Sequence, residues 1–294
     1  MCFSALMNDR MIQKRRTLRS KMGGPMTRAF IAGIIMGTAN LVPGVSAATM
    51  AFLLGIYARL MLALSNIFTG KIEKKDLLFV FFVALGVLLG IVSFARVISI
   101  LLDLYPHATF GAFSGLIVGG IPRFICMLER GKKRTLFWLL LGFAVIMLLS
   151  IAEAGSSEST EFLLERSASK LAFDVLAGFL GAASLVLPGL SGALVLLILG
   201  VYERAITAIT AFDVVILASL GTGILAGIVV MSLTMKRLLA KYKECTIAFL
   251  TGLMIGSVLF LVERSSAVEN PLVFVTSAIV AASLSFVVLR SSQE

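Results

Sequence analysis

Charged residues are scarce in this sequence: 14% of its 294 residues are Asp, Glu, Lys or Arg, whereas a soluble domain averages about 25%. An ionised side chain is costly in a bilayer core, so membrane proteins confine charge to their loops. Hydrophobic residues make up 59% of the chain, and stretches such as 77–95 and 136–151 leave no polar face for water. The composition excludes an ordinary soluble domain and predicts an all-α polytopic membrane protein.

Residues that bind metals or form disulfides are also few. The sequence holds one histidine, His107, and three cysteines, none in a C-x-x-C pair, which excludes a zinc site and a disulfide framework. No carboxylate or histidine stands near the middle of a predicted span. We therefore expect no catalytic residue, no metal and no cofactor, with a proton or a sodium ion left open as a coupling ion.

The apolar residues fall into eight blocks. Six have about 17–23 residues, the length of one helical crossing, and two have about 37–39, too long for one. Each long block carries a Pro-Gly pair near its centre, Pro43-Gly44 and Pro188-Gly189. Proline breaks a helix and glycine permits a sharp reversal, so each long block should be a helix, a break and a second helix. The blocks are 29–65, 77–95, 108–128, 135–152, 171–209, 213–235, 245–262 and 271–289.

The charges between these blocks predict the topology. The net charge of +10 comes from clusters of Lys and Arg beside spans, which indicates the positive-inside pattern rather than a nucleic-acid partner. Tail 1–28 and segments 66–76, 129–134 and 236–244 are basic and should be cytoplasmic, whereas 153–170 and 263–270 are acidic and should lie outside. Both termini are then cytoplasmic, and each long block starts and ends on one side. We favour re-entrant hairpins over two full crossings for these blocks.

The two halves of the chain repeat each other. Pro43-Gly44-x-Ser46 matches Pro188-Gly189-x-Ser191, and Gly55-Ile-Tyr57 matches Gly200-Val-Tyr202, at an offset of 145. After a shorter loop the offset becomes 137, where Asp76 matches Asp213 and Gly115 matches Gly252. The repeats are 29–128 and 171–262, each a hairpin and two spans, with 135–152 joining them and 271–289 following. One joining span turns the second repeat upside down, the inverted plan of secondary transporters, whose sites lie near the midplane at broken helices.

The two Pro-Gly turns are the expected site. A helix that begins after each turn presents backbone N–H groups without partners and a positive dipole end, which together favour an anion. The turns supply the following contacts: Pro43, Gly44, Ser46 and Thr49 in the first copy, and Pro188, Gly189, Ser191 and Gly192 in the second. The serines either contact the anion or only cap their own helices.

Four further polar residues flank the turns. Arg59 and Arg204 occupy equivalent positions near the hairpin mouths, where each either recruits an anionic head group or snorkels to the interface. Asn40 in the first copy and Glu203 in the second have no equivalent in the other half, so the two hairpins should differ in role. Tyr57 and Tyr202 read as interfacial residues.

The string from Gly37 to Tyr57, together with Leu187-Pro188-Gly189-Leu-Ser191-Gly192 and Gly200-Val-Tyr202-Glu203, resembles the membrane family known as domain of unknown function 368. The resemblance covers roughly residues 26–290 and implies a polyprenyl-phosphate translocase of the PopT type. It implies that the chain returns undecaprenyl phosphate, the lipid carrier of cell-wall synthesis, from the outer to the cytoplasmic leaflet of the bacterial inner membrane. Ala47 and Ala48 stand where the family has two glycines, and its acidic residue after the tyrosine is present only as Glu203.

The expected partners are thus an anionic polyprenyl phosphate and the surrounding membrane lipids, and a homo-oligomer is compatible with the sequence. Two other functions stay open at this point. One is a polyprenyl-pyrophosphate phosphatase, for which the acid, base or metal groups are missing. The other is a small-anion transporter, which would use the same site without a lateral opening to lipid.

Overall fold

The structure, a computed structural model, describes residues 24–42, 44–128, 133–154, 165–265 and 270–291. All regular elements in these ranges are helices. The predicted tail 1–28 lies largely outside them, and so does Pro43. The helices are α2 Pro25–Ala39, α3 Ala47–Leu53, α4 Tyr57–Phe68, α5 Lys74–Leu104, α6 Pro106–Ile125, α7 Lys133–Ala154, α8 Ala168–Val186, α9 Gly192–Ile198, α10 Tyr202–Thr210, α11 Val214–Lys241, α12 Lys243–Arg264 and α13 Pro271–Ser291.

Each long apolar block is interrupted twice, not once as the sequence analysis expected. After the Pro-Gly turn comes a helix of seven residues, α3 or α9, and then a second break. Gly55 and Gly200 stand at this second break with φ of +74° and +67°, a left-handed conformation that ends a helix and suits glycine. The chain then bends by 117° into α4 and by 105° into α10. From the sequence, these glycines were identified only as matching positions of the two repeats, and no second break was predicted.

The long helices extend beyond several predicted spans. α5 continues past the expected 77–95 as far as Leu104, and α11 continues past 213–235 as far as Lys241. In α5 no breaker occurs before Tyr105-Pro106, where the proline disfavours helix in the residue before it. The described residues include five helices long and apolar enough to cross a membrane, or up to seven if each bent pair is one span. The chain is therefore an integral membrane protein.

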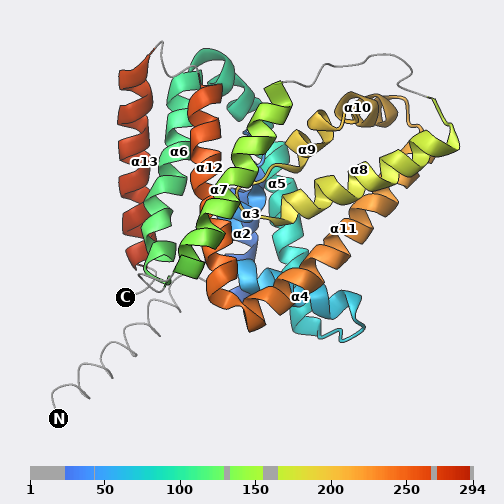
Figure 1. Ribbon diagram of the computed structural model, residues 1–294, viewed down its shortest axis with the longest axis horizontal. Coiled ribbons are helices and arrows are strands. Elements are labelled where there is room, and N and C mark those ends of the chain that lie inside the picture. Colours follow the sequence, from blue (N-terminus) through green and yellow to red (C-terminus); the bar gives the residue numbers. More distant parts are fainter. Residues whose placement is uncertain (1–23, 43, 129–132, 155–164, 266–269, 292–294) are drawn as a thin grey trace.

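Helix pairing follows the internal repeat. α2 packs along α5 as α8 packs along α11, and α6 packs along α13 as α12 packs along α7. Glycines at matching positions permit the close approach: a Cβ on Gly86 would lie 2.2 Å from the Phe30 carbonyl oxygen, and one on Gly223 would lie 2.0 Å from that of Val175. In Figure 1, α13, α6, α12 and α7 stand together on one side, and α8 with α11 slants away on the other.

The core lies around α12, which is the most buried of the spanning helices. Its Leu250, Leu253, Met254 and Leu261 side chains are completely buried. The outward faces of α5, α7 and α13 instead expose large apolar side chains, among them Val92, Ile151 and Leu272. Contiguous apolar surface of this kind is what lipid chains would cover.

Candidate functional site

The two hairpins, far apart in the sequence, meet inside the molecule. The Thr49 hydroxyl on α3 accepts a hydrogen bond from the backbone N–H of Gly189, with a distance of 2.8 Å from N to Oγ1. Thr49 is 1% exposed, so water does not compete for this bond. The first hairpin thereby satisfies a backbone donor that the break in the second hairpin leaves free.

A second buried hydrogen bond joins the same two hairpins. The hydroxyl of Tyr57, at the start of α4, donates to the carbonyl oxygen of Val186, the last residue of α8, at 3.1 Å. Tyr57 is 2% exposed and also packs edge-on against the Phe52 ring. Its interpretation as an interfacial residue is wrong, because the bend at Gly55 turns the ring into the core. Tyr202, its equivalent, is exposed.

Both turns lie against the central helix α12. Gly44 and Gly189 have φ of +86° and +88°, so glycine is needed at each for conformation. A Cβ on Gly44 would lie 2.7 Å from the Phe260 ring, and one on Gly189 would lie 2.6 Å from the backbone of Leu253. Glycine is therefore also needed for space, and the turns are held by packing on their inner side.

The two serines differ in what they contact. Ser46 is fully buried and caps α3, accepting the backbone N–H of Ala48 at 3.2 Å. Ser191 is half-buried and makes no side-chain cap on α9. The dipole argument is weaker than the sequence suggested, because each helix has only seven residues. The uncapped α9 end and the Ser191 hydroxyl are thus better placed to donate to an anion than their counterparts.

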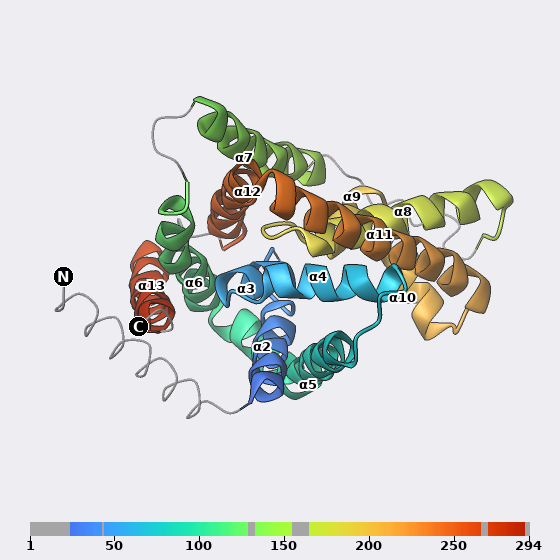
Figure 2. The ribbon, with the colours of Figure 1, turned by 90° about the horizontal axis from the view of Figure 1, so that it is seen from below.

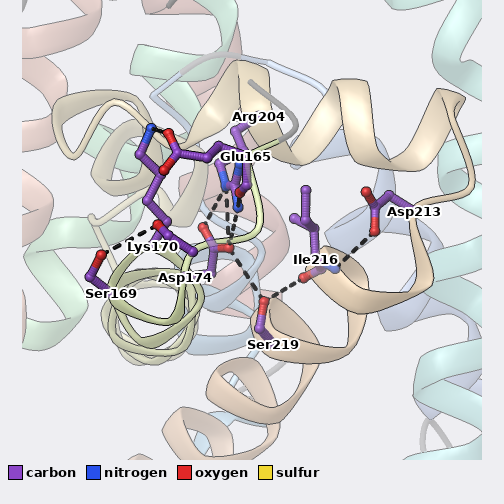
Figure 3. Close-up of polar contacts among 9 residues, drawn as sticks. Glu165, Ser169, Lys170, Asp174, Arg204, Asp213, Ile216 and Ser219 are labelled. Carbon is purple, nitrogen blue, oxygen red and sulfur yellow. Dashed lines mark hydrogen bonds and ion pairs between the residues drawn. The ribbon is translucent and has the colours of Figure 1, made fainter. Parts of the chain in front are cut away.

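Arg204 is engaged in a buried ion pair (Figure 3). Its Nε lies 2.9 Å from Oδ1 of Asp174 on α8, and its Nη2 lies 2.9 Å from Oδ2 of the same carboxylate. The same Nη2 donates to the Glu165 carbonyl oxygen at 2.7 Å. The Arg204 and Asp174 side chains are 8% and 1% exposed. This two-pronged geometry is the one that guanidinium also forms with phosphate.

Arg59, the equivalent of Arg204, has different surroundings. It is exposed, and its guanidinium carbon lies 4.1 Å from the centre of the Phe79 ring on α5. The position equivalent to Asp174 is Ala29, which explains why no matching ion pair forms. Arg59 is accordingly the more accessible of the two arginines for an outside anion.

The remaining predicted residues lie around the turns. Asn40 is exposed at the C-terminal end of α2, and Glu203 is half-buried in the first turn of α10. Pro188 and Gly192 are buried in the second turn and at the start of α9. The predicted residues therefore fall into two groups: those at or beside the Pro-Gly turns, and those at the two bends, which are Arg59, Glu203 and Arg204.

Sequence reasoning missed two residues of this region and the contact made by a third. Asp174 stands near the beginning of the second long block, where a carboxylate among apolar residues is the signal for an intramembrane charge. Ser219 on α11 extends the same cluster, with its hydroxyl 3.4 Å from Asp174 Oδ2. The repeated Gly-x-Tyr string singles out Tyr57, but no local sequence pattern shows that its hydroxyl bonds to the Val186 carbonyl.

Further charged residues lie beside the Arg204–Asp174 ion pair (Figure 3). They come from the segment leading into α8 and from the N-terminus of α11. Asp213 caps α11 through the N–H groups of Val215 and Ile216, and it pairs with Arg166 at 2.9 Å. A hydrogen bond from Lys170 lowers the pKa of Glu165 below its ordinary value. The described residues contain no group of three or more His, Cys, Asp or Glu side chains that could hold a metal ion.

Comparison with known proteins gives two informative relatives. One, named polyprenyl-phosphate transporter, from Vibrio cholerae serotype O1, is 29% identical over 240 residues, which cover 78% of this chain and 75% of the relative. The other, with the same name, from Staphylococcus aureus, is 30% identical over 241 residues, covering 77% and 83%. No solved structure matches the chain. Residues 36–272 match the VCA0040-like family, described as undecaprenyl phosphate translocase-like. The broken-helix turns and nearly all of both repeats fall within this match, and the chain belongs to that family.

Proposed function

We propose that this protein translocates undecaprenyl phosphate from the outer to the cytoplasmic leaflet of the bacterial inner membrane, by alternating access at the two Pro-Gly turns. The observation that carries the proposal is the buried hydrogen bond between the two hairpins, from Gly189 N in the second Pro-Gly turn to Thr49 Oγ1 on α3, the helix after the first turn. Broken helices that meet within a membrane protein are where transporters bind polar substrates. The family description and the two relatives named as polyprenyl-phosphate transporters support the choice of lipid.

The phosphate contacts in this proposal come chiefly from the second hairpin. The hydroxyl of Ser191 and the first N–H groups of α9 can donate to phosphate oxygens, since no serine side chain caps that end. Arg59, exposed at the bend of the first hairpin, lies toward the cytoplasm by the loop charges and would receive the anionic head group there without first leaving a buried partner. The apolar outer faces would let the polyprenyl tail stay in lipid while the head group crosses.

Reconstitution tests this function directly. Purified protein is placed in liposomes that carry a labelled undecaprenyl phosphate in the outer leaflet only, and the fraction protected from an impermeant phosphatase is followed with time. We expect protection to rise faster than in protein-free liposomes. No protein-dependent rise, with or without a proton or sodium gradient, would sink the proposal. Release of inorganic phosphate from undecaprenyl pyrophosphate would indicate a phosphatase instead.

A further inference from the structure

The two hairpins are equivalent in sequence but not in position. We name α3 with α4 the first arm, and α9 with α10 the second arm. The first arm is docked on helices of the other half: α4 packs along α11, and α3 contacts α8. Figure 2 shows α4 running beside α11. Among the described residues the second arm makes no comparable packing on α5 or α2, and it lies instead against α7, α8 and α11.

Specific bonds hold the first arm in its docked position. Tyr57 donates to the Val186 carbonyl and Thr49 accepts from Gly189, both in buried surroundings. At the far end of α4, Asn66 accepts a hydrogen bond from Lys236 of α11 at 2.8 Å and donates to Asp76 of α5 at 2.8 Å. Three separate points therefore tie this arm across the boundary between the halves.

The second arm is held back on its own half. Its Arg204 makes the buried ion pair with Asp174 of α8, at 2.9 Å. Its Tyr202, the equivalent of Tyr57, is 39% exposed. At the repeat offset, the partner equivalent to Val186 is Leu41, which is half-buried at the first turn. The equivalent of the Tyr57 contact is thus not formed in this structure, although its two groups exist. The donor would be the Tyr202 hydroxyl and the acceptor the Leu41 carbonyl.

We infer that the two arms dock in turn, and that the structure is one of two states. In the other state Tyr202 donates to the Leu41 carbonyl, and the Tyr57 bond to Val186 is released. This inference rests on the proposed function, because alternate docking of equivalent arms is how repeats open a shared site to one side at a time. The loop charges place the first hairpin on the cytoplasmic side of the membrane. The docked first arm therefore closes the shared site toward the cytoplasm.

The chain biases the exchange toward the state described. The equivalent of Thr49 is Leu194, which has no hydroxyl to accept a bond from Gly44. The second state lacks that buried hydrogen bond, and it must also loosen the Arg204 pair if α10 moves from α8. The described state is accordingly the resting one, and loss of a single bond on the first arm should populate the other.

Crosslinking distinguishes the two states in the full chain. Cys2, Cys126 and Cys245 are first replaced by serine, and a protease site is placed between α7 and α8 so that a crosslink keeps the halves together. One variant carries Tyr57→Cys with Val186→Cys, and its mirror carries Leu41→Cys with Tyr202→Cys. The probe is a short bis-maleimide with a cleavable disulfide, since a tyrosine side chain spans more than a direct disulfide does.

We expect both pairs to crosslink, the mirror pair in lower yield, and each crosslink to stop lipid translocation until it is cleaved. Adding Tyr57→Phe to the mirror pair should raise its crosslinking rate roughly fivefold, because the lost bond contributes about 1 kcal/mol. Tyr242→Phe, which removes an exposed hydroxyl elsewhere, is the matched control and should leave that rate unchanged.

An absent mirror crosslink in protein that translocates lipid would overturn the alternate docking and leave the proposed function standing. The alternate docking would also be overturned if Tyr57→Phe and Tyr242→Phe changed the crosslinking rate of the Leu41→Cys with Tyr202→Cys pair equally. If the parent protein moves no lipid, the function fails, whereas the crosslinking rates still decide whether the arms exchange.

Discussion

At the scale of single residues, equivalent positions have acquired unequal surroundings. Arg204 is buried against Asp174, whereas Arg59 lies over the Phe79 ring in the open. Ser46 caps a helix and Ser191 does not. The arginines differ because Ala29 stands at the position equivalent to Asp174. Roles carried over from one copy to the other must therefore be tested residue by residue.

The buried ion pair allows a stability test. Asp174→Asn removes the carboxylate that pairs with the buried Arg204 guanidinium, and we expect a loss of about 3–5 kcal/mol in unfolding free energy. The double variant Asp174→Leu with Arg204→Met should recover most of this, because it removes both charges. Thermal unfolding in detergent measures both. Arg166→Gln, which breaks an ion pair with a largely exposed guanidinium, is the control, and a double variant as unstable as the single one would contradict the account.

The serines separate a structural role from a binding role. Ser46→Ala removes a helix cap and should cost about 1 kcal/mol of stability. Ser191→Ala should leave stability nearly unchanged but slow translocation in the liposome assay several-fold, since it removes a donor to the phosphate. Ser283→Ala, on the exposed side of α13, is the control for both readouts. Equal translocation by the Ser191→Ala and Ser283→Ala proteins would rule out a binding role for Ser191.

At the scale of elements, the hairpins depend on where glycine permits a turn. The Pro-Gly strings predicted the first break in each long block. The second break, at Gly55 and Gly200, was predictable only in principle, since isolated glycines in apolar stretches also serve close packing. Gly86 and Gly223 do serve packing, and sequence alone does not distinguish these two uses.

Two glycines make this difference measurable. Gly189→Ala combines a positive φ of +88° with a Cβ only 2.6 Å from the Leu253 backbone. We expect it to destabilise the protein by more than about 1 kcal/mol, because strain and overlap add. Gly221→Ala lies within α11 where a Cβ would meet nothing within 4 Å, so a gain in stability of up to about 1 kcal/mol is expected. Unfolding temperatures in detergent should therefore move in opposite directions, and a shared direction would contradict the packing at Gly189.

At the scale of the whole molecule, the repeat predicts how the halves relate. Glycines at matching positions lie where α2 packs on α5 and where α8 packs on α11. The opposite orientation of the two hairpins in the membrane stays a prediction from loop charges. In the proposed function, this opposite orientation would give the paired turns access from two leaflets.

Sidedness is testable by labelling. Ile72→Cys and Phe212→Cys stand at exposed positions after the first and second arms, 59% and 83% exposed. In a background without native cysteines, an impermeant maleimide added to whole cells should label position 212 and not 72, because the basic segment stays in the cytoplasm. Labelling both after permeabilisation is the control. Equal labelling in intact cells would contradict the inverted arrangement.

The sequence by itself determined the membrane class, the helical blocks, the repeat and the first break in each hairpin. These follow from local composition and spacing: length, charge and Pro-Gly chemistry act within a few residues. Only the tertiary structure decided that Thr49 reaches Gly189, that Tyr57 is buried and that Asp174 pairs with Arg204. Those contacts join residues 30 to 140 positions apart, and they depend on how α12 and the bends at Gly55 and Gly200 bring the hairpins together.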